Sequence, residues 1–394
     1  MGAHRVYAYA SDVRQDGFRA YSEGRFSRAA VFGDVDLKGG ARLRVVATAV
    51  GQDTENPGSL TRDQFRADPR QANARNVATL ASKQTTHLQA GATLEAPTGF
   101  GVVAATAYGV RRDLDNALSY AYIRFDRGAG GVRLSLRNEH GRLSWGTGVD
   151  AGLQVDDRWN WNNVDGGPGS DLQIDQQESV RALAAFGHAR LTLTDRLHLS
   201  GGLRLDHLRF GLDDRLLGPG GDGDASGDRT FAAWSPAVAL AYTLRGTVVF
   251  AGFSTAFESP TTTELVNRPD MTGGFNPDLA PQRVAGLEAG ARGAWVAARL
   301  LYDVAVFRLY VTDRLTPYQT EAGGDRTFYR NSGENVHAGV EAAVEWLATP
   351  EVSLFLTYAG SRFTYRDAPV TGNRLPGVPD HRLVAGVEAG RDGL

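Results

Sequence analysis

Many short segments of this chain alternate regularly between apolar and polar positions. The segment GVEAAVEW, residues 339–346, shows the pattern clearly. Val340 and Val344 are four residues apart, which suits one face of a helix. The same segment also lies within an alternation that runs through residues 336–348, with apolar residues at even positions and both glutamates at odd positions. That alternation suits a strand with one apolar face, so this segment alone leaves both structures open.

Residues 189–205, ARLTLTDRLHLSGGLRL, predict a β-hairpin. Leu191 and Leu193 alternate with threonines, a short turn follows at Asp195-Arg196, and four leucines then alternate with polar residues. A helix would scatter these leucines around its circumference, whereas two paired strands place them on one face. The same pattern surrounds four other short turns, at Lys38–Gly40, Pro97–Gly99, Arg245-Gly246 and Thr349-Pro350.

Long polar segments separate the hairpins, and their Asp, Asn, Gly, Pro and Arg content is typical of loops. They cover residues 53–84, 158–177, 212–230, 258–282, 312–330 and 366–381. The pattern therefore predicts about sixteen strands, joined alternately by short turns and long connections.

A short motif, Gly-Leu-Glu-Ala or Gly-Val-Glu-Ala, begins at Gly286, Gly339 and Gly386, with spacings of 53 and 47 residues. A period of this size is found in β-propellers. Propeller blades hold four short strands, however, and each repeat here holds two long strands and one loop. We therefore interpret GVEAAVEW as a strand whose small apolar residues point outward and whose glutamates point inward.

Long alternating strands, with short turns on one rim and long loops on the other, predict an all-β fold, a transmembrane antiparallel β-barrel. Because lipid offers no hydrogen bonds, such a sheet must pair all its backbone groups. A soluble β-sandwich or barrel is the alternative, but no second layer that would cover the apolar face is encoded. Aromatic residues near the predicted strand ends suit an interfacial girdle, namely Trp234, Tyr242, Trp295, Tyr302, Trp346 and Tyr358.

The composition excludes several other classes of protein. The net charge of −3 gives no basic field that would indicate nucleic acid. The chain has no cysteine, which excludes disulfides and thiolate metal sites. It contains no apolar run long enough for a transmembrane helix, and its first residues lack the charged and apolar segments of a signal peptide. The 48 glycines suit turns and tight packing within a barrel.

Several segments resemble TonB-dependent outer-membrane receptors. FNPDLAPQR at residues 275–283, together with ESPTTTEL before it, is similar to the family segment written NP-x-L-x-P-E, although Gln282 stands in place of the usual Glu. YRNSGENVHAGVE (329–341) and NRLPGVPDHRL (373–383) resemble two further family segments. DGFR (16–19) and PGSLTRDQFRADP (57–69) are similar to loops of the siderophore and ferric-citrate branch.

This resemblance implies a barrel of about 22 strands around a plugged lumen. Nothing in the sequence matches the plug domain, the TonB box or the closing strands. We therefore expect residues 1–394 to be a partial β-barrel domain, an internal fragment with about sixteen of those strands and without the plug. The implied location is the outer membrane of a Gram-negative bacterium. The implied partners are a ferric siderophore or similar chelate, outer-membrane lipid and, through the missing plug, the TonB-ExbB-ExbD complex.

Candidate ligand-binding residues lie in the predicted loop 158–177. Arg158, Trp159 and Trp161 could hold a bulky anionic chelate, and the alternative is that they only pack this loop. No cofactor or metal site is predicted, since a siderophore supplies the iron ligands itself. DGDASGD (222–228) resembles the start of a calcium loop, but Ala233 occupies the place of the bidentate Glu.

No catalytic residues are predicted. Asp195 with His198, or Asp206 with His207, could belong to a Ser-His-Asp arrangement, but no serine in a nucleophile-like turn accompanies them. The resemblance to TonB-dependent receptors implies a receptor for energy-coupled import, and the chain is not expected to be an enzyme. The alternative function is that of a passive porin, because about sixteen strands also suits a porin.

Overall fold

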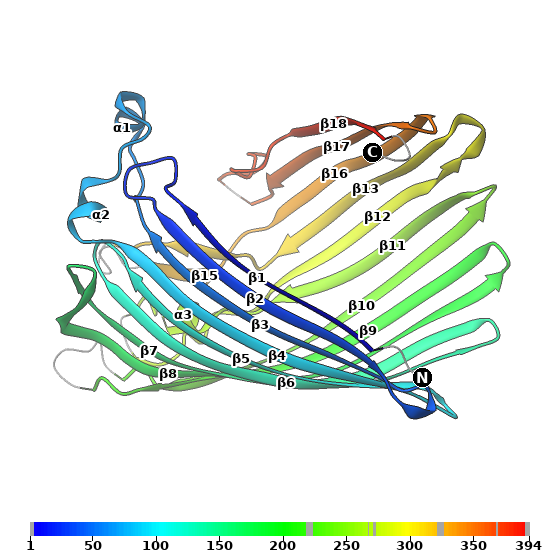
Figure 1. Cartoon of the computed structure of the whole chain (residues 1–394). Helices are drawn as coiled ribbons and strands as arrows, with labels where there is room; N and C mark the ends of the chain where they lie inside the picture. Colours follow the sequence, from blue (N-terminus) through cyan, green and yellow to red (C-terminus); the bar gives the residue numbers. More distant parts are fainter. Residues whose placement is uncertain are drawn as a thin grey trace.

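Sixteen antiparallel strands form one curved sheet in this computed structural model (Figure 1). The structure describes residues 4–217, 224–266, 268–270, 273–320, 327–367 and 369–390. Neighbours in the sheet follow one another in the chain, except that β13 pairs with β16. The strands are β1 (His4–Gln15), β2 (Gly24–Asp36), β3 (Arg42–Glu55), β4 (Ser82–Thr98), β5 (Gly101–Ala117), β6 (Tyr122–His140), β7 (Leu143–Val164), β8 (Gly167–Thr194), β9 (Leu197–Asp214), β10 (Gly227–Leu244), β11 (Thr247–Glu258), β12 (Gln282–Trp295), β13 (Leu300–Thr312), β16 (Asn335–Thr349), β17 (Val352–Tyr365) and β18 (His381–Ala389).

Smaller elements lie in the connections between these strands. β14 (Leu315–Tyr318) and β15 (Phe328–Asn331) form a separate two-stranded sheet between β13 and β16. The helices are short, and among the described residues none is long and apolar enough to cross a membrane. They are η1 (Lys38–Gly40), α1 (Arg62–Ala67), α2 (Ala74–Ala78), α3 (Thr262–Val266) and η2 (Val296–Ala298).

Four short turns that the sequence predicts, after β2, β8, β10 and β16, lie on one rim of the sheet, because these four strands run in the same direction. The long connections, including the one that carries α1 and α2, lie on the opposite rim (Figure 1). At the turn between β10 and β11, Arg245 has φ 48° and Gly246 has φ 88°. Two consecutive positive φ values match the right-handed twist of a hairpin.

GVEAAVEW lies within β16, which confirms that this segment is a strand. The predicted long loop at residues 158–177 is wrong. β7 and β8 continue through it to a two-residue turn at Asp165 and Gly166, where φ is 48° and 77°. Polar residues suggested a loop here because hairpins that extend beyond a membrane are polar on both faces.

The strand register shows which residues share a face. Cross-strand pairs connect Leu191 through Leu199, Leu240, Ala251, Ala289 and Val306 to Val340. The opposite face carries an equivalent series from Thr192 through His198, Ala241, Phe250, Gly290 and Ala305 to Glu341. The predicted apolar outer face is therefore confirmed across seven neighbouring strands, and the inner face carries polar residues together with small residues and one aromatic ring.

Glycines on the inner face make room for aromatic rings from the neighbouring strand. A side chain at Gly290 would begin 2.6 Å from the ring of Phe250, and one at Gly339 would begin 2.6 Å from the ring of Phe307. Glycine in a strand interior often marks such a close approach. The high glycine content is therefore partly a packing requirement of this wall.

The sheet does not close on itself. Among the described residues, β1 pairs only with β2 and β18 pairs only with β17. Figure 1 shows the sheet strongly curved, with these two strands as its free edges. These open edges, on the strands that contain Tyr7 and Val387, agree with the partial barrel that the sequence predicts. A complete sixteen-stranded porin requires these strands to pair, so the porin alternative is not supported.

The assignment of faces predicts that an arginine at two adjacent positions will lower the free energy of unfolding by different amounts. Leu199 lies on the outer face and Ser200 on the inner face of β9. Leu199→Arg should destabilise the membrane-inserted protein by about 2–4 kcal/mol if the site is near the bilayer midplane, because a guanidinium would face lipid. Ser200→Arg should cost far less. Measurement of folding in lipid vesicles with a urea titration tests this, and equal losses for the two variants would contradict the assignment of faces.

Candidate functional site

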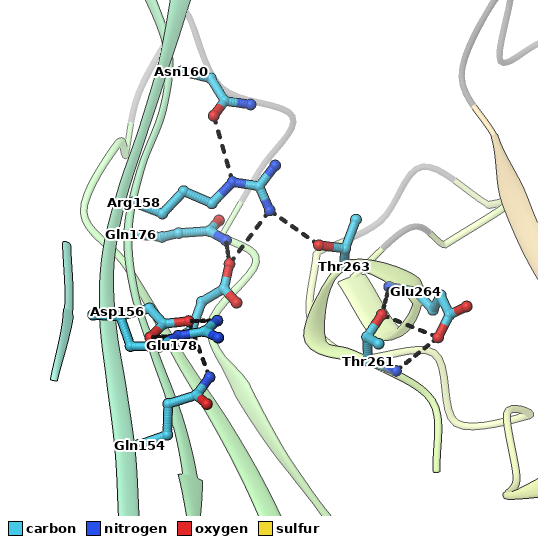
Figure 2. Close-up of polar contacts among 10 residues, drawn as sticks. Gln154, Asp156, Arg158, Asn160, Gln176, Glu178, Thr261, Thr263 and Glu264 are labelled. Atoms are coloured by element: carbon cyan, nitrogen blue, oxygen red, sulfur yellow. Dashed lines mark hydrogen bonds and ion pairs between the residues drawn. The ribbon is translucent and has the colours of Figure 1, made fainter. Parts of the chain in front are cut away.

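A cluster of polar side chains lies on the inner face of β7 and β8, toward the rim with the long connections (Figure 2). β7 contributes Gln154, Asp156 and Arg158, which share a face because they are two residues apart. β8 contributes Gln176 and Glu178, since the register pairs Asp156 with Glu178 and Arg158 with Gln176. Two neighbouring strands therefore gather these five side chains at one place on the wall.

Arg127, on β6, forms a fixed ion pair with Asp156. Its Nε and Nη2 atoms donate to the two carboxylate oxygens at 2.8 and 2.6 Å. Asp156 is buried, and Gln154 also donates to it, at 3.1 Å. The hydrogen bonds that Arg127 donates to Asp156 raise the pKa of Arg127 above its ordinary value. A bidentate pair of this kind is among the stronger polar contacts in proteins. Arg127 therefore stays bound to Asp156 on the inner face of the sheet.

Arg158 is held by longer contacts with several partners. Its Nη1 atom lies 3.5 Å from a carboxylate oxygen of Glu178 and donates to the hydroxyl of Thr263 at 3.0 Å. Its Nε atom donates to the side-chain oxygen of Asn160 at 3.4 Å. Glu178 accepts a shorter bond, of 2.7 Å, from Gln176. Arg158 can therefore exchange partners at a lower cost than Arg127 can.

Thr263 belongs to the connection between β11 and β12, which folds against the inner wall (Figure 2). This connection contains α3, at whose start Thr261 and Glu264 exchange hydrogen bonds in a capping box. Apolar side chains from the connection and from β9 and β10 form a buried cluster. Its members are Phe210, Leu212, Phe231, Leu265, Phe275 and Leu279. Burial of these residues fixes the connection inside the curve of the sheet.

The far end of the same connection is fixed by polar contacts. The Nη2 atom of Arg229, on β10, donates to the carbonyl oxygens of Pro277 and Leu279 at 2.6 and 3.1 Å. The side chain of Asn331, on β15, accepts from the backbone of Ala280 at 2.6 Å and donates to its carbonyl at 2.7 Å. The connection between β11 and β12 is thus linked to the connection between β13 and β16, and Arg229 links it to the sheet.

The three ligand-binding candidates from the sequence do not lie together. Arg158 is in strand β7 and points inward. Trp159 pairs with Arg124 of β6, and Trp161 pairs with Tyr122, on the opposite face of the sheet. The expectation that all three share one loop is wrong, because the alternation of β7 continues through this stretch and sends neighbouring side chains to opposite faces.

Trp161 belongs to an outward-facing cluster, and Trp159 lies on the same face. The rings of Trp161 and Tyr122 are 6.2 Å apart, and the hydroxyl of Tyr122 donates to Asp115 at 2.7 Å. Arg124 donates to the same carboxylate oxygen at 2.6 Å. Burial, together with the hydrogen bond to Asp115, raises the pKa of Tyr122 to about 12. This cluster stabilises the hairpin on its outer side.

Sequence reasoning missed most of the inner cluster. The alternation of Gln154, Asp156 and Arg158 along β7 is the signal that could have found it, but the predicted loop begins at Arg158 and interrupts the pattern there. The partnership with Thr263 has no local signal, since the two residues are 105 positions apart. The calcium-like segment begins at Asp222, outside the described residues. Among the residues that the structure describes, no group of three or more His, Cys, Asp or Glu could hold a metal ion.

Comparison with known proteins identifies the family. Residues 7–391 match the model of the TonB dependent receptor-like β-barrel. This chain therefore belongs to the family of TonB-dependent receptors, whose members are outer-membrane transporters and not enzymes.

Solved structures of this fold are similar to the chain over nearly its whole length. The ferric citrate transporter FecA has a TM-score of 0.79 and 16% identity, and the match covers 98% of this chain and 58% of FecA. The ferric yersiniabactin uptake receptor FyuA from Yersinia pestis has a TM-score of 0.77 and 14% identity, with 98% and 60% covered. The copper transporter OprC has a TM-score of 0.77 and 16% identity, with 99% and 61% covered. At these identities the likeness shows the fold, and the chain spans about three fifths of each relative.

The hydrogen bond between Arg158 and Thr263 predicts a measurable effect on the connection. Arg158→Gln and Thr263→Val should each increase amide hydrogen exchange in α3, because each removes the same bond from wall to connection. Thr263→Ser keeps the hydroxyl and should leave exchange unchanged. The double variant Arg158→Gln/Thr263→Val should exceed neither single variant, as expected for two partners of one contact. Additive effects would contradict the contact.

The raised pKa of Tyr122 predicts a pH-dependent stability. The folded pKa of about 12 lies above the ordinary value of 10.0, so the neutral phenol favours the folded state. Its contribution is complete below about pH 10 and is lost as the pH rises through 12. The difference in absorbance at the tyrosinate band between the natural protein and Tyr122→Phe should titrate near pH 12, with Tyr120→Phe as the control. A midpoint near pH 10 would contradict the burial of this hydroxyl.

Proposed function

We propose that this chain forms part of an outer-membrane receptor that imports a ferric siderophore or a similar metal chelate. Membership of the TonB-dependent receptor family supports import across the outer membrane. The names of FecA and FyuA, a ferric citrate transporter and a ferric yersiniabactin uptake receptor, support an iron chelate as the cargo. Energy would come from the TonB-ExbB-ExbD complex.

The receptor would also require parts that lie outside this chain. The chain covers 58% of FecA and 60% of FyuA, and its sheet has two unpaired edges. In lipid, each unpaired backbone group costs several kcal/mol, on the order of that for a buried amide without a partner. We infer that residues 1–394 supply a partial barrel domain, and that further strands and a plug domain complete the receptor.

The proposal rests on the orientation and the hydrogen-bond partners of Arg158. Its guanidinium faces the interior and is held by three contacts of 3.0–3.5 Å, whereas Arg127 beside it is committed to Asp156. A carboxylate or catecholate oxygen of a chelate could replace Thr263 and Asn160 as its partner, because a guanidinium binds oxyanions in a planar, bidentate manner. Trp159 and Trp161 face the other way, so we assign ligand contact only to Arg158.

Transport of bare copper is a second possibility raised by OprC, named as a copper transporter. Thioether and thiolate groups are the ligands that select Cu(I). This chain contains two methionines and no cysteine. The available side chains therefore favour recognition of a chelate, which brings its own metal ligands.

Growth and binding assays test this function. The full-length protein should restore growth on one ferric chelate of a panel, for example ferric citrate or a ferric catecholate, in an iron-limited strain without its own receptors. Growth should require TonB, because import is energy-coupled. Growth that is equally fast without TonB would indicate a passive pore and contradict the proposal.

A substitution at Arg158 tests the assigned contact in the same system. Arg158→Gln should weaken binding of the chelate that supports growth by roughly tenfold, equivalent to about 1.4 kcal/mol. Arg158→Lys should recover only part of it, because lysine cannot form a bidentate bond. Quenching of tryptophan fluorescence on titration with the ferric chelate gives the affinity, with Arg70→Gln, near Phe18, as a control. Unchanged affinity of Arg158→Gln would remove Arg158 from the site.

A further inference from the structure

Two arginines on the outer face of β8 and β9 lie directly opposite each other. The register pairs Arg181 with Arg209, and it pairs Arg181 with Leu153 on the other side. Leu183 and Leu205, on the same two strands, point outward with exposed fractions of 57% and 50%. Because side chains on a strand alternate, Arg181 and Arg209 face outward as well.

This pair lacks an adequate counter-charge within the protein. Arg209 lies 3.5 Å from Asp228, but both side chains are more than half exposed, and exposed ion pairs contribute little. Among the described residues, no carboxylate lies within ion-pair distance of Arg181. Like charges directly opposite each other on a sheet are destabilising. Elsewhere on the outer face, by contrast, Arg124 is paired with Asp115 and Arg111 with Asp113 and Asp126.

The position of the pair along the strands corresponds to a membrane interface. Below it on the outer face lie Leu183, Leu205 and Trp234, and Trp234, which pairs with Leu205, is 62% exposed. Exposed tryptophan next to an apolar band is typical of the level of lipid headgroups. The arginines lie beyond this band, on the side of the long connections. They would therefore meet the headgroup layer of the leaflet on that side.

We propose that Arg181 and Arg209 together bind the phosphate group of an outer-leaflet lipid headgroup. A phosphate between two guanidinium groups neutralises their repulsion and accepts several charge-assisted hydrogen bonds, and the apolar band beneath them would contact the acyl chains. The proposal rests on the outer-membrane location in the proposed function, and it does not depend on which chelate is imported.

Native mass spectrometry of the full-length protein in detergent micelles tests the site. The probe is bisphosphorylated lipid A, titrated into micelles of a neutral detergent. The natural protein should retain bound lipid A, and Arg181→Gln/Arg209→Gln should lower the apparent affinity at least tenfold. The control is Arg190→Gln, which removes an arginine from the inner face of the same strand and should change the affinity less than twofold. Arg181→Lys/Arg209→Lys keeps both charges and should retain most of the binding.

Two further arms distinguish a lipid headgroup from other sources of the same chemistry. Lipid A without its phosphates should bind at least tenfold more weakly, and free inorganic phosphate should not compete at concentrations that match lipid A. Equal binding by the double glutamine variant, or by dephosphorylated lipid A, would overturn the proposal. Competition by free phosphate at equal concentration would also overturn it, since it would indicate a simple anion site.

A parallel measurement separates this proposal from the proposed function. Chelate binding by Arg181→Gln/Arg209→Gln should equal that of the natural protein, because the two arginines lie on the face opposite Arg158. Loss of lipid binding with intact chelate binding is the expected outcome. Absence of chelate binding in the natural protein, with lipid A retained, would contradict the proposed function and leave the lipid site supported.

Discussion

The absence of hydrogen-bonding partners in lipid is the constraint on which this structure depends. Every backbone group that crosses the membrane must pair within the sheet, so the strands are long, antiparallel and joined to their chain neighbours. Side chains that face lipid also lack hydrogen-bonding partners, which explains the apolar band on the outer face from Leu191 on β8 to Val340 on β16. The two edges at β1 and β18 are the places where the described residues leave the requirement unmet.

The inner face of the sheet does not contact lipid, so it can carry charged and bulky side chains. Charged side chains on this face form ion pairs, as Arg127 does with Asp156 and Arg133 with Asp150. Aromatic rings on this face pack over glycines of the neighbouring strand, as the ring of Phe250 does over Gly290. Close contacts therefore hold the inner face at these positions. The looser contacts of Arg158 differ from this background, and they lie where an inward-folded connection meets the wall.

Strands β7 to β9 show how one segment can serve two environments. On the inner face of β8, Glu178 and Gln176 support Arg158, while Arg181 on the outer face of the same strand has no ion-pair partner among the residues that the structure describes. The side-chain period of two separates these roles with only two residues between Glu178 and Arg181. A change of register by one residue would exchange the two faces, which is why the turn at Asp165 and Gly166 matters to both.

The sequence by itself determined the strands, the short turns and the direction of each face, because these follow from local alternation and turn chemistry. It also indicated the family through segments such as FNPDLAPQR. It could not determine that β7 and β8 extend through residues 158–177, since polar strands beyond the membrane resemble loops in composition. Only the tertiary structure decided that Arg158 meets Thr263, that Trp161 packs on Tyr122, and that Arg181 lies opposite Arg209. These contacts join residues on different strands and connections, and their formation depends on register and on burial of the connection, which no local pattern encodes.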